Sequence, residues 1–315
     1  MSVPDIVPFT IAMLIDPEEE LPPSDEDALR YFESAAHMLQ LDLVRVTPAD
    51  MYAGKIIPDA LFIRMTTYAD GVAYKLACWA EAAGIPVIDD PESIVVCTDK
   101  AEFLQRMWAR DISVPKTYIL GGSWDVIKSR PHLLKPEGFD FPLILKTPEG
   151  CFSRGVFKVN TLKELEAKAA ELLETRNRIL VQEFVPTPFD WRIGVLGGEA
   201  LWACKYYMAP EHWQIYDHKH GGKCGKFDTV PFRDVPPEIT KLALEACSAI
   251  GEGLYGVDLK ERDGKFYVIE VNDNPNIDGD VEDLVMGTKI YTRILMHLFC
   301  KAQSNKVTEK KRSAG

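Results

Sequence analysis

Three oxygen-bearing side chains near the C-terminal end of the sequence have the types and spacing of a cation site. Glu270 and Asn272 alternate with apolar residues, which is the period of a half-buried strand, so their side chains share one face. Asp258 alternates with apolar neighbours in the same way on the preceding segment, and a turn signal, Asp263-Gly264, separates the two segments. The pattern therefore predicts a hairpin that carries two carboxylates and an amide.

The register of this hairpin decides whether the three polar side chains meet. If Glu261 pairs with Lys265 across a three-residue loop, Asp258 lies opposite Val268 and on the same face as Glu270. A register shift of one residue would separate the ligands. The opposite, apolar face is then expected to carry Val257, Leu259, Tyr267, Ile269 and Val271.

Oxygen ligands of this kind suit Mg²⁺, which is usually held by one or two carboxylates together with the phosphates of a substrate. The triplet of Asp258, Glu270 and Asn272 therefore indicates a nucleotide site. An ordinary acidic surface hairpin would show the same alternation, so the motifs upstream must distinguish the two interpretations.

A lysine and a glycine-containing loop form the first upstream motif. Lys146 ends the apolar strand expected at 142–146, and the loop 147–155 leads to a returning strand at 156–159. Such a loop can lay backbone N–H groups along a phosphate, and the lysine would add a positive charge beside it. A strand-end lysine is also a common solvated charge, so this motif alone is weak.

An irregular segment, 208–232, contains three histidines and several lysines around Gly221-Gly222. Long irregular segments inside compact domains are usually functional or disordered. His212, His218 and His220 do not repeat a familiar metal-ligand spacing, so a cationic loop that faces an anionic substrate is the favoured interpretation.

The elements that position these residues divide into two regions. Residues 8–95 show the order β-α-β-β-α-β, which predicts a small parallel sheet with helices against it, although no G-x-G-x-x-G follows the first strand. From Asp99-Lys100 onward the chain indicates strands, hairpins and amphipathic helices. The expected segments include strands at 9–15, 43–46, 60–63 and 85–88, and helices at about 24–39, 67–83, 101–110, 162–173, 237–252 and 281–299.

Composition excludes several classes of function. The net charge of −12 and the pI of about 5.1 argue against nucleic acid as a partner, because such binding needs a basic surface. The seven cysteines are odd in number and show no C-x-x-C spacing, which argues against a disulfide framework or a zinc site. We find no export signal and no apolar window of membrane length, so a cytoplasmic protein without a membrane partner is expected.

Taken together, five motifs resemble the ATP-grasp superfamily, and they are most similar to the RimK-like carboxylate–amine ligases over roughly residues 98–300. The motifs are Lys100, Lys146 with its loop, Gln182-Glu183-Phe184-Val185, Asp190-Trp191-Arg192, and Asp258 with Glu270-Val271-Asn272. The resemblance implies a mixed α+β and α/β fold. A small Rossmann-like domain at 1–97 would precede an ATP-grasp domain at 98–302, in which two α+β subdomains grip ATP, with a central lid subdomain at about 115–185 and a disordered tail at 303–315.

The resemblance also implies a role for each matched position. The implied nucleotide contacts are Lys100 and Lys146 at the phosphates, Ser153, Arg154 and Gly155 in the lid, Gln182, Glu183, Phe184 and Val185 along the adenine, and Asp190 at the ribose. The implied metal ligands are Asp258, Glu270 and Asn272, for Mg²⁺ or Mn²⁺. Arg192 would hold the acyl phosphate or the carboxylate being activated.

One part of the sequence departs from the family pattern. An Arg-Ser-Asn run precedes the Gly-Gly pair in the most similar subgroup, whereas this chain has Ile215-Tyr216-Asp217 at the matching place, one residue displaced. The nucleotide contacts of that run do not transfer. Lys205 and His220 are the candidates to replace them, and with Arg192 they are the residues expected to act in catalysis.

The implied activity is an ATP-dependent ligation that proceeds through an acyl phosphate and releases ADP and phosphate. Phosphoryl transfer depends on positioning and charge neutralisation, which fits a site of lysines, an arginine and Mg²⁺ without a nucleophilic side chain. Two alternatives stay open: a kinase that phosphorylates a small molecule, with Asp217 or His218 as its base, and an ATP-binding regulatory protein without turnover.

The implied partners are a small-molecule or peptide carboxylate and an amine such as an amino acid. An anionic group on either could be bound by a cationic set, Arg64, Arg192, Lys219, His220 and Lys223, although each could equally be a solvated charge. Related ligases commonly self-associate, so a homo-oligomer is consistent with the resemblance. The sequence leaves the substrates and the oligomeric state open.

Overall fold

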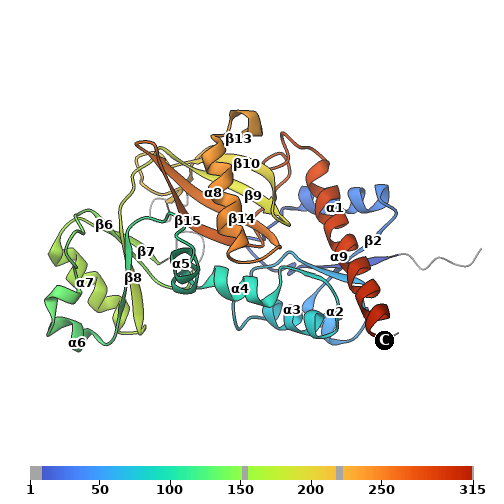
Figure 1. Ribbon diagram of the computed structural model, residues 1–315, viewed down its shortest axis with the longest axis horizontal. Helices are drawn as coiled ribbons and strands as arrows, with labels where there is room; N and C mark the ends of the chain where they lie inside the picture. Colours follow the sequence, from blue (N-terminus) through green and yellow to red (C-terminus); the bar gives the residue numbers. More distant parts are fainter. Residues whose placement is uncertain (1–8, 151–154, 218–222, 314–315) are drawn as a thin grey trace, which may run out of the picture.

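Three large sheets lie in a row along the length of the molecule in the computed structural model, which describes residues 9–150, 155–217 and 223–313; within these ranges a fourth, two-stranded sheet pairs β11 with β12. A four-stranded sheet with α1 to α3 and α9 forms one end, a five-stranded sheet with α8 forms the middle, and a second four-stranded sheet with α6 and α7 forms the other end (Figure 1). The arrangement confirms a mixed α/β architecture with separate subdomains.

The N-terminal sheet is parallel throughout, in the order β2-β1-β3-β4, as the sequence predicted. Helix α1 begins after Asp25, whose side chain accepts a hydrogen bond from Ala28 N at 2.8 Å. The elements are β1 Thr10–Leu14, α1 Glu26–Met38, β2 Asp42–Val46, α2 Pro48–Tyr52, β3 Ala60–Ile63, α3 Val72–Ala82, β4 Val87–Ile88 and α4 Pro91–Thr98.

Two boundaries in this region differ from the prediction. Helix α3 begins at Val72 instead of residue 67, because Gly71 is its N-cap and donates its N–H to Tyr68 O in a preceding turn. Residues 66–70 therefore form a loop at the end of β3. The short helices α2 and α4 were not predicted, and each starts with a proline after a capping residue, Thr47 and Asp90 respectively.

The central subdomain is an antiparallel sheet in the order β5-β8-β6-β7, preceded by helix α5, Lys100–Trp108. Helices α6 and α7 cover one of its faces, and its buried residues form a cluster that comes entirely from residues 120–181. Its elements are β5 Thr117–Gly121, α6 Trp124–Lys128, the 3₁₀ turn Pro131–Leu133, β6 Leu143–Lys146, β7 Val156–Val159, α7 Leu162–Leu173 and β8 Arg178–Glu183.

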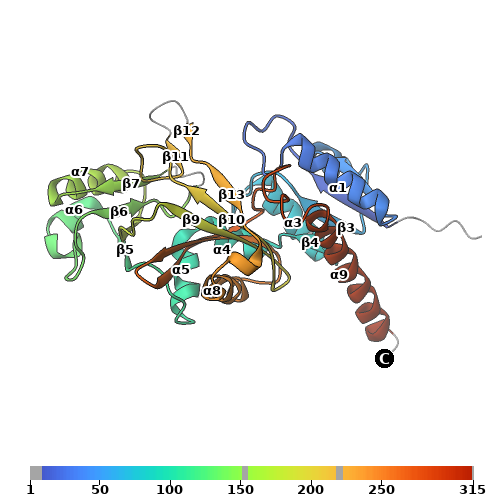
Figure 2. The same cartoon turned by 90° about the horizontal axis from the view of Figure 1, so that it is seen from above.

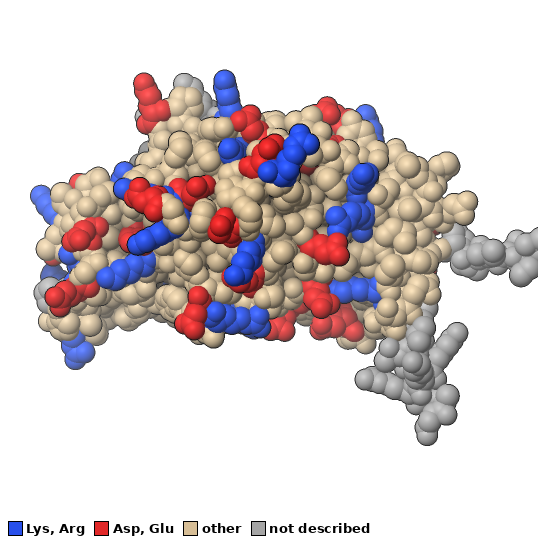
Figure 3. Space-filling view, turned by 45° about the horizontal axis from the view of Figure 1, so that its top comes forward, with Lys and Arg blue, Asp and Glu red and all other residues tan. Residues whose placement is uncertain are grey.

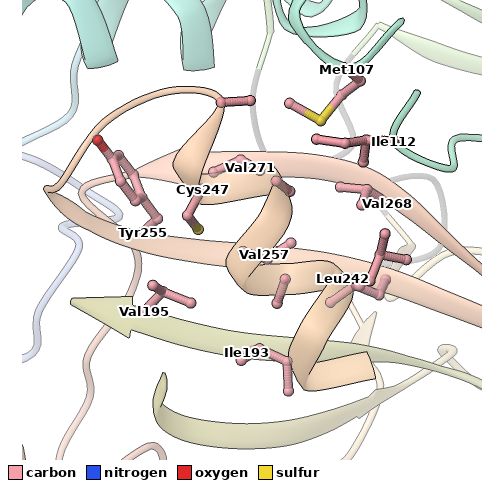
Figure 4. Close-up of a cluster of buried hydrophobic side chains, with 14 of the residues drawn as sticks. Met107, Ile112, Ile193, Val195, Leu242, Cys247, Tyr255, Val257, Val268 and Val271 are labelled. Atoms are coloured by element: carbon pink, nitrogen blue, oxygen red, sulfur yellow. The ribbon is translucent and has the colours of Figure 1, made fainter. Parts of the chain in front are cut away.

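The five-stranded sheet has the order β13-β10-β9-β14-β15. Helix α8 packs on one face, where Leu242 and Cys247 meet Val257, Val268 and Ile193 of the strands (Figure 4). The other face packs in part against the N-terminal sheet and α9, through residues such as Trp202 and Cys204, and in part lines the candidate site. The elements are β9 Phe189–Leu196, β10 Glu199–Tyr207, β11 Tyr216–Asp217, β12 Lys223–Cys224, β13 Phe227–Thr229, the 3₁₀ turn Phe232–Asp234, α8 Pro237–Ser248, β14 Leu254–Arg262 and β15 Lys265–Asp273.

The predicted register of the β14–β15 hairpin is wrong by one residue. Arg262 pairs with Lys265 around a two-residue turn, because Asp263 and Gly264 both have positive φ, 51° and 72°. A bulge after Asp258 adds a second shift of one residue, so that Leu259 lies opposite Val268 while Asp258 lies opposite Glu270 and the three polar side chains still share a face. Ile269 is the extra residue, and it lines the cavity described below instead of the apolar core.

The final helix, α9 (Lys289–Ser313), begins later and ends later than predicted. Turns occupy residues 281–288, where the sequence predicted helix. The helix then continues to Ser313, through most of the tail 303–315 for which the sequence predicted disorder, because the Lys, Glu and Arg residues of that tail are good helix formers. Buried residues such as Ile294 and Leu298 pack α9 against β3 and α1, and Figure 2 shows its end projecting from the body. No helix within the described ranges is long and apolar enough to cross a membrane.

Acidic and basic side chains are interspersed on the face shown in Figure 3, without a continuous field of one sign there. The described part of the chain holds five free cysteines, 78, 97, 204, 247 and 300.

Candidate active site

A cavity of about 710 Å³ lies where the three sheets meet. The central subdomain contributes the ends of β6 and β8, the five-stranded sheet contributes β9, β14 and β15, and the N-terminal region contributes the loop 66–70. Of the residues predicted to bind nucleotide or metal, a majority line this one cavity. They are Lys100, Lys146, Gln182, Glu183, Phe184, Val185, Asp190, Arg192, Asp258, Glu270 and Asn272.

The three expected metal ligands converge at one wall of the cavity. Asp258 and Glu270 face each other across the hairpin, and their carboxyl groups are within hydrogen-bonding reach. The Nδ2 of Asn272 donates to Asp258 Oδ2 at 3.3 Å and to Gly256 O at 3.2 Å. The bulge, which sequence reasoning missed, is what brings the two carboxylates directly opposite.

Arg192 is the direct ion-pair partner of Asp258. Its Nε and NH2 donate to the two carboxylate oxygens of Asp258 at 2.7 and 2.8 Å, a bidentate pair between neighbouring strands. Burial raises the pKa of Asp258 to about 6, although Arg192 opposes the shift. The arginine predicted to hold an anionic substrate group is thus placed next to the predicted metal site.

Two lysines supply positive charge opposite this wall. Lys146, at the end of β6, is only 7% exposed, and burial lowers its pKa to about 8. Lys100 begins α5, and its Nζ donates to Gly150 O at 2.5 Å. Burial acts to raise the pKa of Glu270, but the charges of Lys100, Lys146 and Arg192 outweigh it, so the pKa is lowered and Glu270 is ionised.

The segment predicted to line adenine follows the exit of β8 from its sheet. Gln182 is buried and its Nε2 donates to Thr117 Oγ1 at 2.8 Å, while the Glu183 carboxylate accepts the Lys116 N–H at 2.8 Å. The Phe184 ring lies under Lys158 Nζ at 3.8 Å and meets Trp213 edge-on at 5.9 Å. This end of the cavity is apolar and aromatic.

Asp190, predicted to reach the ribose, is paired with a lysine that the sequence analysis missed. Lys260 Nζ donates to Asp190 Oδ1 and, at 2.8 Å, to Thr187 Oγ1. Lys260 lies two residues after Asp258 on β14 and therefore on the same face. The same period-2 alternation that predicted the position of Asp258 also predicts that Lys260 lies on this face.

Two predicted roles do not agree with the structure. Lys205 lies on the opposite face of the sheet from Arg192, with its Nζ 4.7 Å from the ring centroids of Phe189 and Trp191, because neighbouring residues of a strand point to opposite faces. Arg64 is 1% exposed and donates to Ser24 Oγ, Asn274 Oδ1 and two backbone carbonyls, so it is occupied within the protein and cannot bind substrate.

Several predicted residues lie outside the described ranges: Ser153 and Arg154 of the lid loop, and His218, Lys219 and His220 of the irregular segment. Gly155 is described. It has φ +74°, and a Cβ there would lie 2.2 Å from Thr147 Oγ1, so the start of β7 requires glycine.

Sequence reasoning also missed the residues that fix the hairpin from the N-terminal region. Asp89, at the end of β4, accepts the N–H of Leu254 at 2.7 Å and of Asn274 at 2.8 Å. Leu254 is the first residue of β14, and Asn274 directly follows the last residue of β15. Asp89 has no signal in its own sequence neighbourhood, because its partners are 165 and 185 residues away.

The donor set fits Mg²⁺. Two carboxylates that approach this closely repel each other unless a cation or a proton lies beside them. No group of three or more His, Cys, Asp or Glu able to hold a metal occurs in the described part of the chain. A site of two carboxylates and one amide, completed by phosphate oxygens, is the kind that Mg²⁺ prefers.

Comparison with known proteins identifies what the chain is similar to. The model of the RimK-like ATP-grasp domain family matches residues 97–298. A probable alpha-L-glutamate ligase of Marinomonas sp. (strain MWYL1) is 27% identical over 266 residues, which is 82% of each chain.

Solved structures show the same fold at lower identity. The ATP complex of a D-alanine–D-alanine ligase from Bacillus anthracis has a TM-score of 0.65 at 17% identity, covering 95% of this chain and 98% of that one. A RimK domain ATP-grasp protein from Sphaerobacter thermophilus DSM 20745 has a TM-score of 0.63 at 18% identity, covering 90% and 97%.

Proposed function

Because the chain belongs to the RimK-like ATP-grasp family, we propose that it is an ATP-dependent ligase that joins a carboxylate to an amine through an acyl phosphate. The observation that carries this proposal is the convergence of Lys100, Lys146, Arg192 and the β14–β15 carboxylates on one cavity. Such a set can neutralise a triphosphate and orient a second anion beside it.

In the proposed reaction a carboxylate oxygen of the substrate attacks the γ-phosphorus of ATP, and ADP leaves. The amine then attacks the acyl carbon, and phosphate leaves with the oxygen that bonded to phosphorus. Lys146 and Lys100 would hold phosphate oxygens, and the guanidinium of Arg192 would hold the carboxylate. Mg²⁺ on Asp258, Glu270 and Asn272 would neutralise charge on the phosphates.

The remaining walls agree with a nucleotide at the central subdomain and an acceptor at the N-terminal region. Phe184, Val185, Ile269 and Trp213 would exclude water from the base, and Gln182 would sit at its edge. The loop 66–70 lines the same cavity, and the amine would enter beside it. We infer an amino acid as one of the two substrates, because the relative described above is a probable alpha-L-glutamate ligase.

The test is a phosphate-release screen with ATP, Mg²⁺ and pooled amino acids and short peptides, followed by mass spectrometry of the products. We expect phosphate release that needs both a carboxylate and an amine, and a product lighter than the sum of its substrates by one water. A phosphorylated product formed without an amine would replace the ligase by the kinase alternative. Binding of ATP without turnover in any pool would support a regulatory protein.

A further inference from the structure

A fully buried carboxylate that the proposed mechanism does not use lies close to Arg192. Glu282 is 0% exposed, and both of its oxygens accept hydrogen bonds, Oε1 from the Tyr206 hydroxyl and Oε2 from Asp278 N at 2.8 Å. Burial raises the pKa of Glu282 to about 7, and the charge of Arg192 opposes the shift. A carboxylate buried this deeply is costly unless a nearby positive charge compensates it.

Tyr206 stands between this carboxylate and the guanidinium. The direct partner of Arg192 on β10 is Cys204, so Tyr206 is its diagonal neighbour on the same face of the sheet. The guanidinium carbon lies 5.0 Å from the centroid of the Tyr206 ring, within the range of a cation–π contact. The hydrogen bond to Glu282 polarises the hydroxyl and makes the ring more electron-rich, which strengthens this contact.

Arg192 is therefore fixed from two neighbouring strands. Asp258 on β14 holds the edge of the guanidinium through two hydrogen bonds, and Tyr206 on β10 supports its face. A planar guanidinium presents parallel N–H groups to a carboxylate only when its plane is set correctly. The described residues that line the cavity do not include Tyr206 or Glu282. We therefore expect any effect of these two side chains on the substrate to pass through Arg192.

We propose that Tyr206 and Glu282 are positioning residues that set the plane of the Arg192 guanidinium for the substrate carboxylate. This inference rests on the proposed function, in which Arg192 binds that carboxylate. Glu282 holds the Tyr206 hydroxyl through a hydrogen bond, and the Tyr206 ring supports the guanidinium.

The experiment compares Tyr206→Phe, Glu282→Gln and the double variant in steady-state kinetics with a substrate pair from the screen. We expect the KM for the carboxylate to rise about tenfold in each single variant, while the KM for ATP changes by less than about twofold. The double variant should be little worse than either single one, because the two groups act as a unit.

Tyr207→Phe is the matched control. Tyr207 is the next residue of β10, its hydroxyl donates to Asp228 Oδ2 at 2.8 Å, and it points away from the Arg192 face. Its substitution removes the same kind of hydrogen bond and should leave both KM values unchanged.

Thermal unfolding of each variant distinguishes a changed position of Arg192 from a loss of folding stability. Because Glu282 is fully buried, Tyr206→Phe, which keeps the ring, decides the outcome if Glu282→Gln does not fold. An unchanged carboxylate KM in Tyr206→Phe, or an equal rise of both KM values, would overturn the inference alone. Unsubstituted protein that turns over no ATP with any pool would overturn the proposed function and this inference with it.

Discussion

The metal-site hairpin and the central subdomain are attached to the rest of the molecule in different ways. The β14–β15 hairpin is tied to the N-terminal region by buried hydrogen bonds: Asp89 accepts the N–H groups of Leu254 and Asn274, and Arg64 donates to Asn274 Oδ1 at 2.7 Å. The central subdomain instead has a core of its own, drawn from residues 120–181.

The connections of the central subdomain to the other parts are mixed. The ion pair between Arg178 and Asp99 and the hydrogen bond from Lys100 Nζ to Gly150 O are partly or fully exposed, whereas Leu180 of β8 is buried in the core of the five-stranded sheet. We infer that the ligands of the metal are held on the rigid side of the cavity, whereas Lys146 and the adenine-facing segment belong to a unit that can shift as ATP enters. The predictions below test this difference.

The largest expected effect is a loss of turnover when the β14–β15 metal site is changed. Glu270→Gln keeps the shape of the side chain but removes a charge from the metal site, so kcat should fall by about 100-fold or more. The thermal midpoint should stay close to that of the unsubstituted protein, since the glutamine amide can keep the hydrogen bond to Asp258.

Asp263→Asn is the control for this change. Asp263 lies at the exposed turn of the same hairpin with φ +51°, a conformation that asparagine tolerates, so turnover should not change. Full activity in Glu270→Gln would remove the metal-site assignment.

The second effect is on stability. Asp89→Ala leaves two buried backbone N–H groups without an acceptor, and the free energy of unfolding should fall by about 2–4 kcal/mol in urea titrations. Thr117→Val in the central subdomain removes the acceptor of Gln182 Nε2 and the partly buried hydrogen bond from Thr117 Oγ1 to Pro115 O, and it should cost about 1–2 kcal/mol. Equal losses in the two variants would contradict the difference in anchoring.

The smallest expected effect is a pH dependence of kcat/KM for ATP, which arises from Lys146 in the central subdomain. Burial lowers the pKa of Lys146 to about 8, so its ammonium loses a proton as the pH rises through that value. The kcat/KM for ATP, which reports the free enzyme, should therefore decrease by about tenfold per pH unit above 8.

Lys146→Arg distinguishes this lysine from other titrating groups. The guanidinium keeps its charge across the accessible range, so the decrease should disappear or move to higher pH. The same decrease in the variant would show that another group is responsible.

Local patterns were sufficient for much of the fold. Period-2 alternation found the strands that carry Asp258 and Glu270, and the element order found the parallel N-terminal sheet. The hairpin register failed because a two-residue turn followed by a bulge also places Asp258, Glu270 and Asn272 on one face, while Tyr267 and Val268 exchange the faces that the sequence predicted. The proposed division at residue 97 stays a prediction.

Long-range contacts explain the remaining misses. Arg64 looked like a substrate ligand, but its partner Asn274 is 210 residues away and buries it. Lys205 could be assigned to a face only after the position of α8 was known. The pairing of Tyr206 with Glu282 spans 76 residues and has no local signal.

The most direct test of the account follows oxygen from the substrate into phosphate. A carboxylate labelled with ¹⁸O is incubated with ATP, Mg²⁺, the amine and the protein, and the phosphate released is weighed by mass spectrometry. The acyl-phosphate route predicts one ¹⁸O in phosphate for each amide formed. Phosphate without label, or pyrophosphate in its place, would contradict it.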